Sequence, residues 1–207
     1  MAYTLWVMTS DILGKIMGGP NRIKLMRLFI FNPDRLFDRS SASVFTKIPI
    51  NKLGKELNLL QSIGMIKEKS LSVKDRQKTK ARVGFGLVEN FTLAQPLRLL
   101  LNADFLRRRD ELVKRFKNCG RIKLLLISGI FIEDTDSRID LVIVGDALKR
   151  TVIERIIHGI EAEVGRELNY ALFDTEDFSY RANTSDKFIR DIYDYPHERI
   201  IDKLPFN

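Results

Sequence analysis

The two residues of this sequence that are best placed to take part in chemistry are Arg138 and Asp140. They form a charged pair at the start of an apolar, strand-like run. That run, residues 139–144, and an earlier one, residues 124–132, are rich in Ile, Leu and Val, while the segment between them is acidic and turn-forming. The pattern predicts a buried β-hairpin. Because side chains alternate along a strand, Arg138 and Asp140 should share one face of the second strand. A guanidinium placed there would repel a divalent cation and could neutralise the carboxylate.

This arrangement resembles the nucleotidyltransferase fold of the DNA polymerase beta type, in its minimal form. Members of that family carry a Gly-Ser pair after one strand and an Asp-x-Asp at the start of the next, and their carboxylates hold the metal ions that bridge the triphosphate. Here Ser128-Gly129 stands in reversed order, and Arg138 occupies the first aspartate position. The nearest match to the family's third carboxylate is Asn169. The resemblance therefore implies a vestigial active site made of Ser128, Gly129, Arg138, Asp140 and Asn169.

Of these metal-holding positions only Asp140 keeps a carboxylate, so we expect a nucleotidyltransferase shell that has no transferase chemistry, no metal and no cofactor. The alternative is an active enzyme with a rearranged metal site, in which Asp136 or Asp174 would join Asp140. The acidic turn that contains Glu133, Asp134 and Asp136 could also be read as a metal cluster, but turns are more often acidic for solubility and local hydrogen bonding.

A second stretch with functional potential is a predicted helix that begins after Pro49. Apolar residues recur at three- and four-residue spacing and form a stripe: Ile50, Leu53, Leu57, Leu60 and Ile63. The opposite side is polar and basic, with Asn51, Lys52, Lys55, Asn58 and Gln61. Gly64 ends the helix, and two strands, residues 65–72 and 80–88, then form a hairpin with a lysine-rich tip.

Two predicted helices precede that stretch, a strong one over residues 21–31 and a weak one over residues 38–45 that Asp38 can cap. Helix, weak helix, strong helix and basic hairpin together resemble a winged helix-turn-helix over residues 21–88. The resemblance implies a recognition helix in the major groove of DNA and a wing on the phosphate backbone. The residues that it assigns to DNA binding are Asn51, Lys52, Lys55, Asn58, Gln61, Lys74, Arg76, Lys78, Lys80 and Arg82. Gly54 within the recognition helix could permit close approach to DNA or to a neighbouring helix, or could be a packing glycine.

The charge of the chain supports a nucleic-acid partner for its first part. The formal net charge of +8 is the sum of +13 in residues 1–120 and −5 in residues 121–207. A basic half of this kind favours contact with a polyanion. A solubilising lysine surface would also explain it.

The element order predicts an α+β protein with a winged helix-turn-helix domain in residues 1–95, connecting helices in 96–120 and a small mixed-sheet nucleotidyltransferase-like domain in 121–207. The two connecting helices are expected over residues 95–101 and 104–118. The last domain should hold a helix over residues 147–164, a third strand over 168–173 and a final helix over 185–195. No apolar run is long enough for a membrane span, and the N-terminus does not read as a signal peptide. A single cysteine, Cys119, cannot form an internal disulfide. We therefore expect a cytoplasmic protein.

The functional expectation is a DNA-binding protein that is similar to a transcriptional regulator and acts on double-stranded DNA. The second domain would sense a nucleotide or protein ligand, form a homodimer or dock a partner. Besides the active transferase, the alternative is an RNA-binding or scaffold protein, because winged helices also contact RNA and protein.

Overall fold

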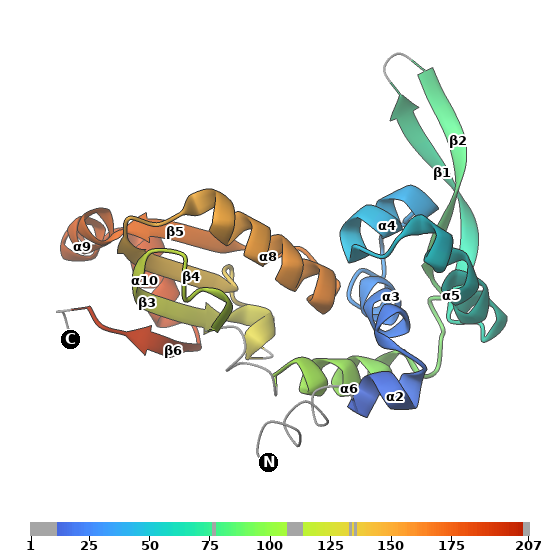
Figure 1. Cartoon of the computed structure of the whole chain (residues 1–207), viewed down its shortest axis with the longest axis horizontal. Coiled ribbons are helices and arrows are strands. Elements are labelled where there is room, and N and C mark those ends of the chain that lie inside the picture. The colour runs from blue at the N-terminus through green and yellow to red at the C-terminus, as the bar shows by residue number, and fades with distance from the viewer. Residues whose placement is uncertain (1–11, 76–77, 107–113, 133, 135, 205–207) are drawn as a thin grey trace. The chain divides into compact units, whose positions relative to one another are not determined.

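The computed structural model describes residues 12–75, 78–106, 114–132, 134 and 136–204 (Figure 1). The side chains of residues 71–75, 78–82 and 104–106 lie outside this description. The chain combines helices and sheets, as an α+β protein does, and divides into two compact units. The first unit consists of Met1–Phe105 with Ile160–Arg166, and the second of Leu106–Gly159 with Glu167–Asn207.

The described part of the first unit begins with the helices α2 (Ile12–Met17), α3 (Pro20–Ile30), α4 (Arg39–Thr46) and α5 (Ile50–Ser62). The predicted helices over residues 21–31 and 38–45 are thus confirmed as α3 and α4. Asp38 caps α4 as expected, because the backbone amide of Ser41 donates a 2.7 Å hydrogen bond to its Oδ1. This cap explains why a serine-rich segment of low helical propensity still forms a helix.

The helix α5 packs its leucine stripe into the core of the first unit. Leu53, Leu57 and Leu60 are completely buried, as the three- and four-residue spacing predicted. The two ends of the predicted stripe are wrong, since Ile50 is 58% exposed and Ile63 is 54% exposed. Ile50 is the first helical residue and Ile63 lies just after the last one, so neither has a turn of helix on both sides to direct it into the core.

A long antiparallel hairpin follows α5 and consists of β1 (Ile66–Asp75) and β2 (Lys78–Leu87). Both strands extend further toward the tip than the predicted 65–72 and 80–88. Phe37 forms an isolated bridge with Phe85, with reciprocal backbone hydrogen bonds of 2.9 and 2.8 Å. Because Phe85 and Ile66 are buried, the base of the hairpin is fixed in the core while the strands run outward from α5 (Figure 1).

The helix α6 (Ala94–Leu106) follows the hairpin and is longer than the predicted connecting helix, residues 95–101. A second connecting helix was predicted over residues 104–118. Its first three residues belong to α6, residues 107–113 lie outside the described residues, and only residues 114 and 115 are helical in the remainder.

The second unit is built on a four-stranded mixed sheet in the order β5-β4-β3-β6. Its strands are β3 (Arg121–Ser128), β4 (Leu141–Asp146), β5 (Tyr170–Asp174) and β6 (His197–Asp202). Strands β4 and β5 are parallel, whereas β3 is antiparallel to both of its neighbours. The other described elements of this unit are the 3₁₀ turn η1 (Gly129–Phe131) and the helices α8 (Arg150–Val164), α9 (Thr175–Asn183) and α10 (Lys187–Asp194) (Figure 1).

Three features of this unit differ from the prediction. The first strand ends at Ser128 instead of residue 132, because Gly129 adopts a positive φ of 56° and starts the turn η1. The second strand begins at Leu141 instead of residue 139. Helix α9 and strand β6 were not predicted, whereas α8, β5 and α10 correspond to the expected helix, strand and final helix.

Alternating residues of the sheet supply two buried faces. Leu124, Leu126, Val142 and Val144 pack with apolar residues of α9 and α10, among them Phe178, Ile189 and Ile192. The intervening residues Leu125, Ile127 and Ile143 are buried as well. Among the helices that the structure describes, none is both long enough and apolar enough to cross a membrane.

Candidate functional site

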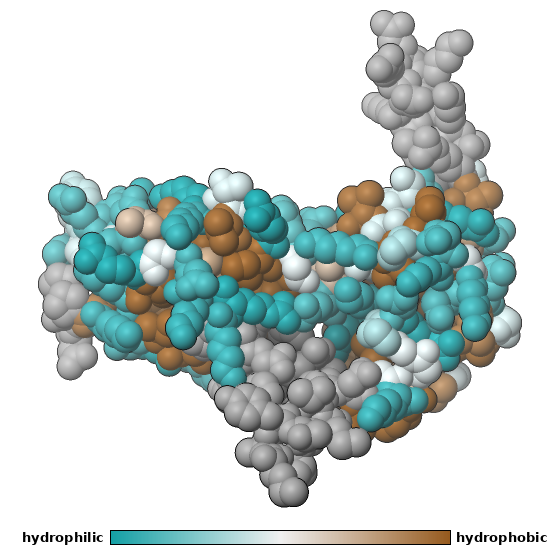
Figure 2. Space-filling view, in the orientation of Figure 1, coloured by the Kyte–Doolittle hydropathy of each residue, from teal (hydrophilic) through white to brown (hydrophobic). Residues whose placement is uncertain are grey.

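The outer face of α5 carries every residue of that helix that the sequence assigned to DNA binding. All of them are exposed: Asn51, Lys52, Lys55, Asn58 and Gln61. The core leucines lie on the other side of the same helix, so their burial directs the polar side chains outward. Hydrophilic residues dominate the surface in this region of the space-filling view, with apolar patches beside the base of the hairpin (Figure 2).

The direction of α5 is fixed by polar contacts at its inner edge. Arg22 of α3 forms a 2.8 Å ion pair with Glu56, whose side chain is largely buried, and donates a second hydrogen bond to the Met17 carbonyl. At the other end, the backbone amide of Met65 donates to the Leu60 carbonyl, and Gly64 adopts a φ of 73°. These contacts terminate α5 and lead the chain directly into β1.

Gly54 lies on the half-exposed flank of α5, one turn from Asn51 and Asn58. A β-carbon added at this position would find no described heavy atom within 4 Å. Among the described residues, no neighbouring helix packs against Gly54 closely enough to require a glycine there.

The hairpin holds the other predicted DNA-binding residues. Lys74, Lys78, Lys80 and Arg82 belong to the outer halves of β1 and β2, where Lys74 is opposite Thr79. Their side chains are outside the description, and Arg76 is itself outside the described residues. Two further lysines of β1, Lys67 and Lys69, are exposed closer to α5 and were not assigned a role from the sequence.

In the second unit, one edge of the sheet brings together the residues that the nucleotidyltransferase resemblance selected. The backbone amide of Ser128 donates to the Asp140 carbonyl over 2.9 Å, and the amide of Asp140 donates to the Asn169 carbonyl over 2.7 Å. Strand β3 ends at this edge, whereas β4 and β5 begin there. Four of the five residues that the resemblance selected therefore lie close together: Ser128, Gly129, Asp140 and Asn169.

Asp140 is buried, and both oxygens of its carboxylate accept backbone hydrogen bonds. Ile130 donates to Oδ1 over 3.0 Å, and Asn169 donates to Oδ2 over 2.9 Å. A β-carbon on Gly129 would collide with Oδ1, so the glycine is needed for this approach. In this arrangement the carboxylate connects the turn η1 to the start of β5.

Arg138 points elsewhere. Its side chain is 72% exposed, and its Nη1 lies 3.6 Å from Oδ2 of Asp191 in α10. The prediction that Arg138 and Asp140 share a strand face is wrong, because β4 begins only at Leu141 and strand alternation does not apply before that residue.

The buried Ser128 hydroxyl also has an internal partner on each side. It donates to the Pro196 carbonyl over 2.6 Å and lies 2.9 Å from the hydroxyl of Ser137. Ser137 in turn donates to the Ile139 carbonyl over 2.7 Å. The two hydroxyls thus link the end of β3 to the segment 129–140 and to the residue before β6. The sequence did not predict β6 at this edge of the sheet.

Asp174, one of the carboxylates that a rearranged metal site would use, is not brought to Asp140. Leu141 is paired with Tyr170 and Gly145 with Asp174, so Asp174 lies at the far end of β5, roughly 13 Å along the strands from that edge. Asp174 there pairs with Arg150 over 3.6 Å. Within the described residues, no group of three or more His, Cys, Asp or Glu side chains could hold a metal ion.

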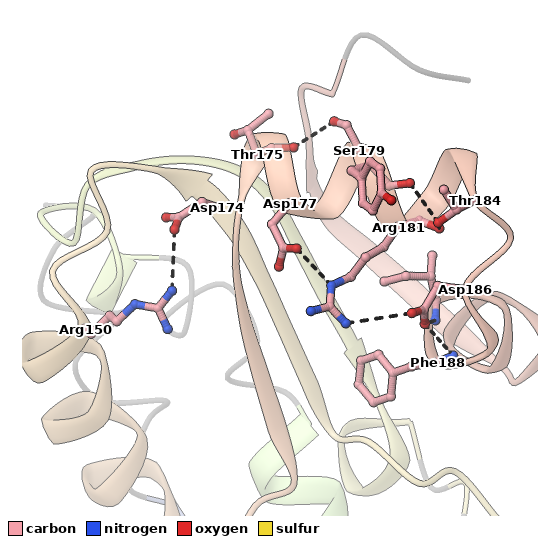
Figure 3. A network of polar contacts seen from close by, with 11 residues as sticks. Arg150, Asp174, Thr175, Asp177, Ser179, Arg181, Thr184, Asp186 and Phe188 are labelled. Atoms are coloured by element: carbon pink, nitrogen blue, oxygen red, sulfur yellow. Dashed lines mark hydrogen bonds and ion pairs between the residues drawn. The ribbon is translucent and has the colours of Figure 1, made fainter.

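The far edge of the sheet instead carries a network of ion pairs (Figure 3). Arg181 of α9 pairs with Asp177 over 3.0 Å and with Asp186 over 3.7 Å, and its guanidinium lies over the Phe173 ring. The hydrogen bond to Asp177 raises the pKa of Arg181. These contacts join α9 to the start of α10, and each acidic group in the network has a basic partner, so we interpret the network as structural.

Asp146, at the end of β4, is a further partnered carboxylate at the far edge. The Thr175 side chain and then the Lys123 ammonium, 3.0 Å away, lower the pKa of Asp146 below its usual range.

Burial raises the pKa of the Cys119 thiol, which fits an inert cysteine.

No family model, no curated protein and no solved structure matches this chain.

Proposed function

We propose that this protein binds double-stranded DNA through α5 and the β1–β2 hairpin, in the manner of a winged helix-turn-helix transcriptional regulator. The observation that carries the proposal is the division of α5 into two sides. Leu53, Leu57 and Leu60 are completely buried, while the polar and basic residues of the helix are exposed on the opposite side. A helix held in this way presents a row of hydrogen-bonding side chains of the kind that reads base edges in the major groove.

The charge distribution supports the same proposal. The first 120 residues have a formal charge of +13, and basic residues occur along the hairpin as well as on α5. Lys52 and Lys55 would contact bases or phosphates, and the hairpin would mainly contact phosphates. Neutralisation of phosphates releases counterions, so the binding should weaken steeply with salt.

For the second unit we propose a nucleotidyltransferase-like shell without transferase chemistry. Asp140 is the one carboxylate that remains at the metal-holding positions, and both of its oxygens accept hydrogen bonds from backbone amides. Transfer chemistry on this fold requires carboxylates that converge on metal ions and triphosphate. The unit would then serve to sense a nucleotide or protein ligand, to form a homodimer or to dock a partner.

The proposal is tested by DNA binding of the full chain and of one matched pair of variants. We expect Asn51→Ala combined with Asn58→Ala to lower sequence discrimination in a selection from random duplexes. Asn183→Ala is the control, since Asn183 is an exposed asparagine of α9 in the second unit. Binding of RNA in preference to duplex DNA, or no binding to either, would contradict the proposal.

A further inference from the structure

The chemistry of the exposed face of α5 points to a particular class of base pair. Its amide side chains are Asn51, Asn58 and Gln61, and the helix contains no arginine. Amide side chains make bidentate hydrogen bonds to N6 and N7 of adenine, whereas the commonest specific contact to guanine comes from arginine. The composition of this face therefore favours adenine over guanine.

Ile50 adds a second, independent observation. It is the first residue of α5, directly before Asn51, and it is 58% exposed although it is a large apolar residue. The N-terminal residues of a recognition helix are those that contact base edges. The one apolar group on a base edge in the major groove is the thymine methyl, which is contacted by apolar side chains. An A·T pair would thus offer adenine to Asn51 and a methyl group to Ile50.

The spacing of the two asparagines sets the spacing of the contacted pairs. Asn58 follows Asn51 by seven residues, which is two turns and about 10.5 Å along the helix axis. Seven residues rotate the helix to within roughly 20° of the same face. With a rise of about 3.4 Å per base pair, a helix that lies along the groove places its two asparagines about three base pairs apart. Gly54 stands between them and leaves the backbone uncovered on that flank.

We infer that α5 recognises A·T base pairs, with Asn51 and Asn58 on adenines about three base pairs apart and Ile50 against a thymine methyl. This inference rests on the proposed DNA binding and names the class of site that the same helix reads.

The test begins with selection of binding sequences from random duplexes by the full chain. The selected site is then resynthesised with deoxyuridine in place of thymidine, which removes the methyl group, or with 7-deazaadenine in place of adenine, which removes the N7 acceptor. We expect each change at a contacted pair to weaken binding, and disruption of a bidentate hydrogen-bonded pair to weaken it roughly 5- to 150-fold. Ile50→Ala should abolish the difference between thymidine and deoxyuridine. Asn51→Ala should abolish the difference between adenine and 7-deazaadenine at the base pair that Asn51 contacts, and should keep it at the pair that Asn58 contacts.

Asn183→Ala should keep both differences, and thermal unfolding should show that Ile50→Ala folds, since Ile50 is exposed. A selected site that consists of G·C pairs, or equal binding to the thymidine and deoxyuridine duplexes by the unmodified protein, would overturn the inference while leaving DNA binding intact. Failure to bind any duplex would instead contradict the proposed function, and with it the inference.

Discussion

The backbone amide of Asn169 donates a 2.9 Å hydrogen bond to Oδ2 of Asp140, so the residue before β5 is held by the carboxylate that precedes β4. The Oδ1 atom of the same carboxylate accepts from Ile130 in the turn η1. Asp140 therefore joins the turn η1, the start of β4 and the start of β5. A residue chosen from the sequence as a remnant of metal chemistry is, in the structure, a buried acceptor for backbone amides.

Loss of this carboxylate should destabilise the second unit. Asp140→Ala leaves the buried amide of Ile130 and the partly buried amide of Asn169 without their acceptor, at a cost of about 2 to 4 kcal/mol in the free energy of unfolding. Asp140→Asn should cost less, because its amide oxygen can still accept. Urea unfolding monitored by circular dichroism gives the values. Asp136→Ala, a change at an exposed residue of the same connection, is the control and should stay within about 0.5 kcal/mol of the parent. Equal stability of the Asp140 and Asp136 variants would refute the structural role.

Restoring carboxylates at the vestigial site should not restore a metal site. We expect Arg138→Asp combined with Asn169→Asp to show no shift in melting temperature when magnesium is added, because Asp140 is buried with both oxygens engaged by amides. Removal of the exposed Arg138–Asp191 pair should itself cost at most about 1 kcal/mol. The unmodified protein should transfer no label from any nucleoside triphosphate. A magnesium-dependent rise in the melting temperature, or label transfer, would contradict this interpretation of the site.

Substitution of Gly54 should have opposite effects on the stability of the protein and on its affinity for DNA. Gly54→Ala should raise the free energy of unfolding by about 0.5 to 1 kcal/mol, since alanine is the better helix former and no described atom obstructs its β-carbon. The same variant should bind DNA more weakly if the helix backbone approaches the duplex on this flank. Gly64→Ala is the opposite case and should destabilise the protein, because Gly64 has a φ of 73°. Unchanged DNA affinity of Gly54→Ala would remove this flank of α5 from the interface.

The Asp146 carboxylate should make a pH-dependent contribution to stability. The Thr175 side chain and then Lys123 lower the pKa of Asp146 in the folded state, so the ionised form is favoured by folding. Its contribution is present above the usual aspartate pKa and is lost as the pH falls through the lowered value. Asp146→Asn should therefore melt below the parent at pH 6 and approach it at about pH 2. A difference in melting temperature that is the same at both pH values would contradict this assignment.

The helices and strands that were predicted from the sequence are those whose buried residues recur at a regular spacing or form a continuous apolar run. Leu53, Leu57 and Leu60 lie on one side of a helix, and the apolar runs of β3 and β4 exceed the length of any turn. Strand β6 gave no comparable signal, because charged and apolar residues do not alternate in His197–Asp202. Helix α9 likewise buries only Phe178 and so has no apolar stripe.

The hydrogen bonds and ion pairs around Asp140 join residues that are far apart in the sequence. A pattern of neighbouring residues therefore cannot predict them. The apolar run continues past Ser128, yet the chain turns at Gly129, where a φ of 56° and the close approach of Asp140 both favour glycine. The position of Arg138 depends in the same way on Asp191 of α10. Residue types at the site were therefore predictable, whereas their partners were not.

The salt dependence of DNA affinity tests the central claim most directly. We expect the logarithm of the association constant of the full chain for a duplex to fall linearly with the logarithm of salt concentration, measured by fluorescence anisotropy. Lys78→Ala combined with Lys80→Ala should make that slope shallower by about 1.8, or about 0.9 for each phosphate that is no longer neutralised. Lys187→Ala combined with Lys203→Ala removes the same charge from exposed positions of the second unit and should leave the slope unchanged. Equal slopes for the parent and both variants, or an affinity that does not depend on salt, would contradict DNA binding through the hairpin.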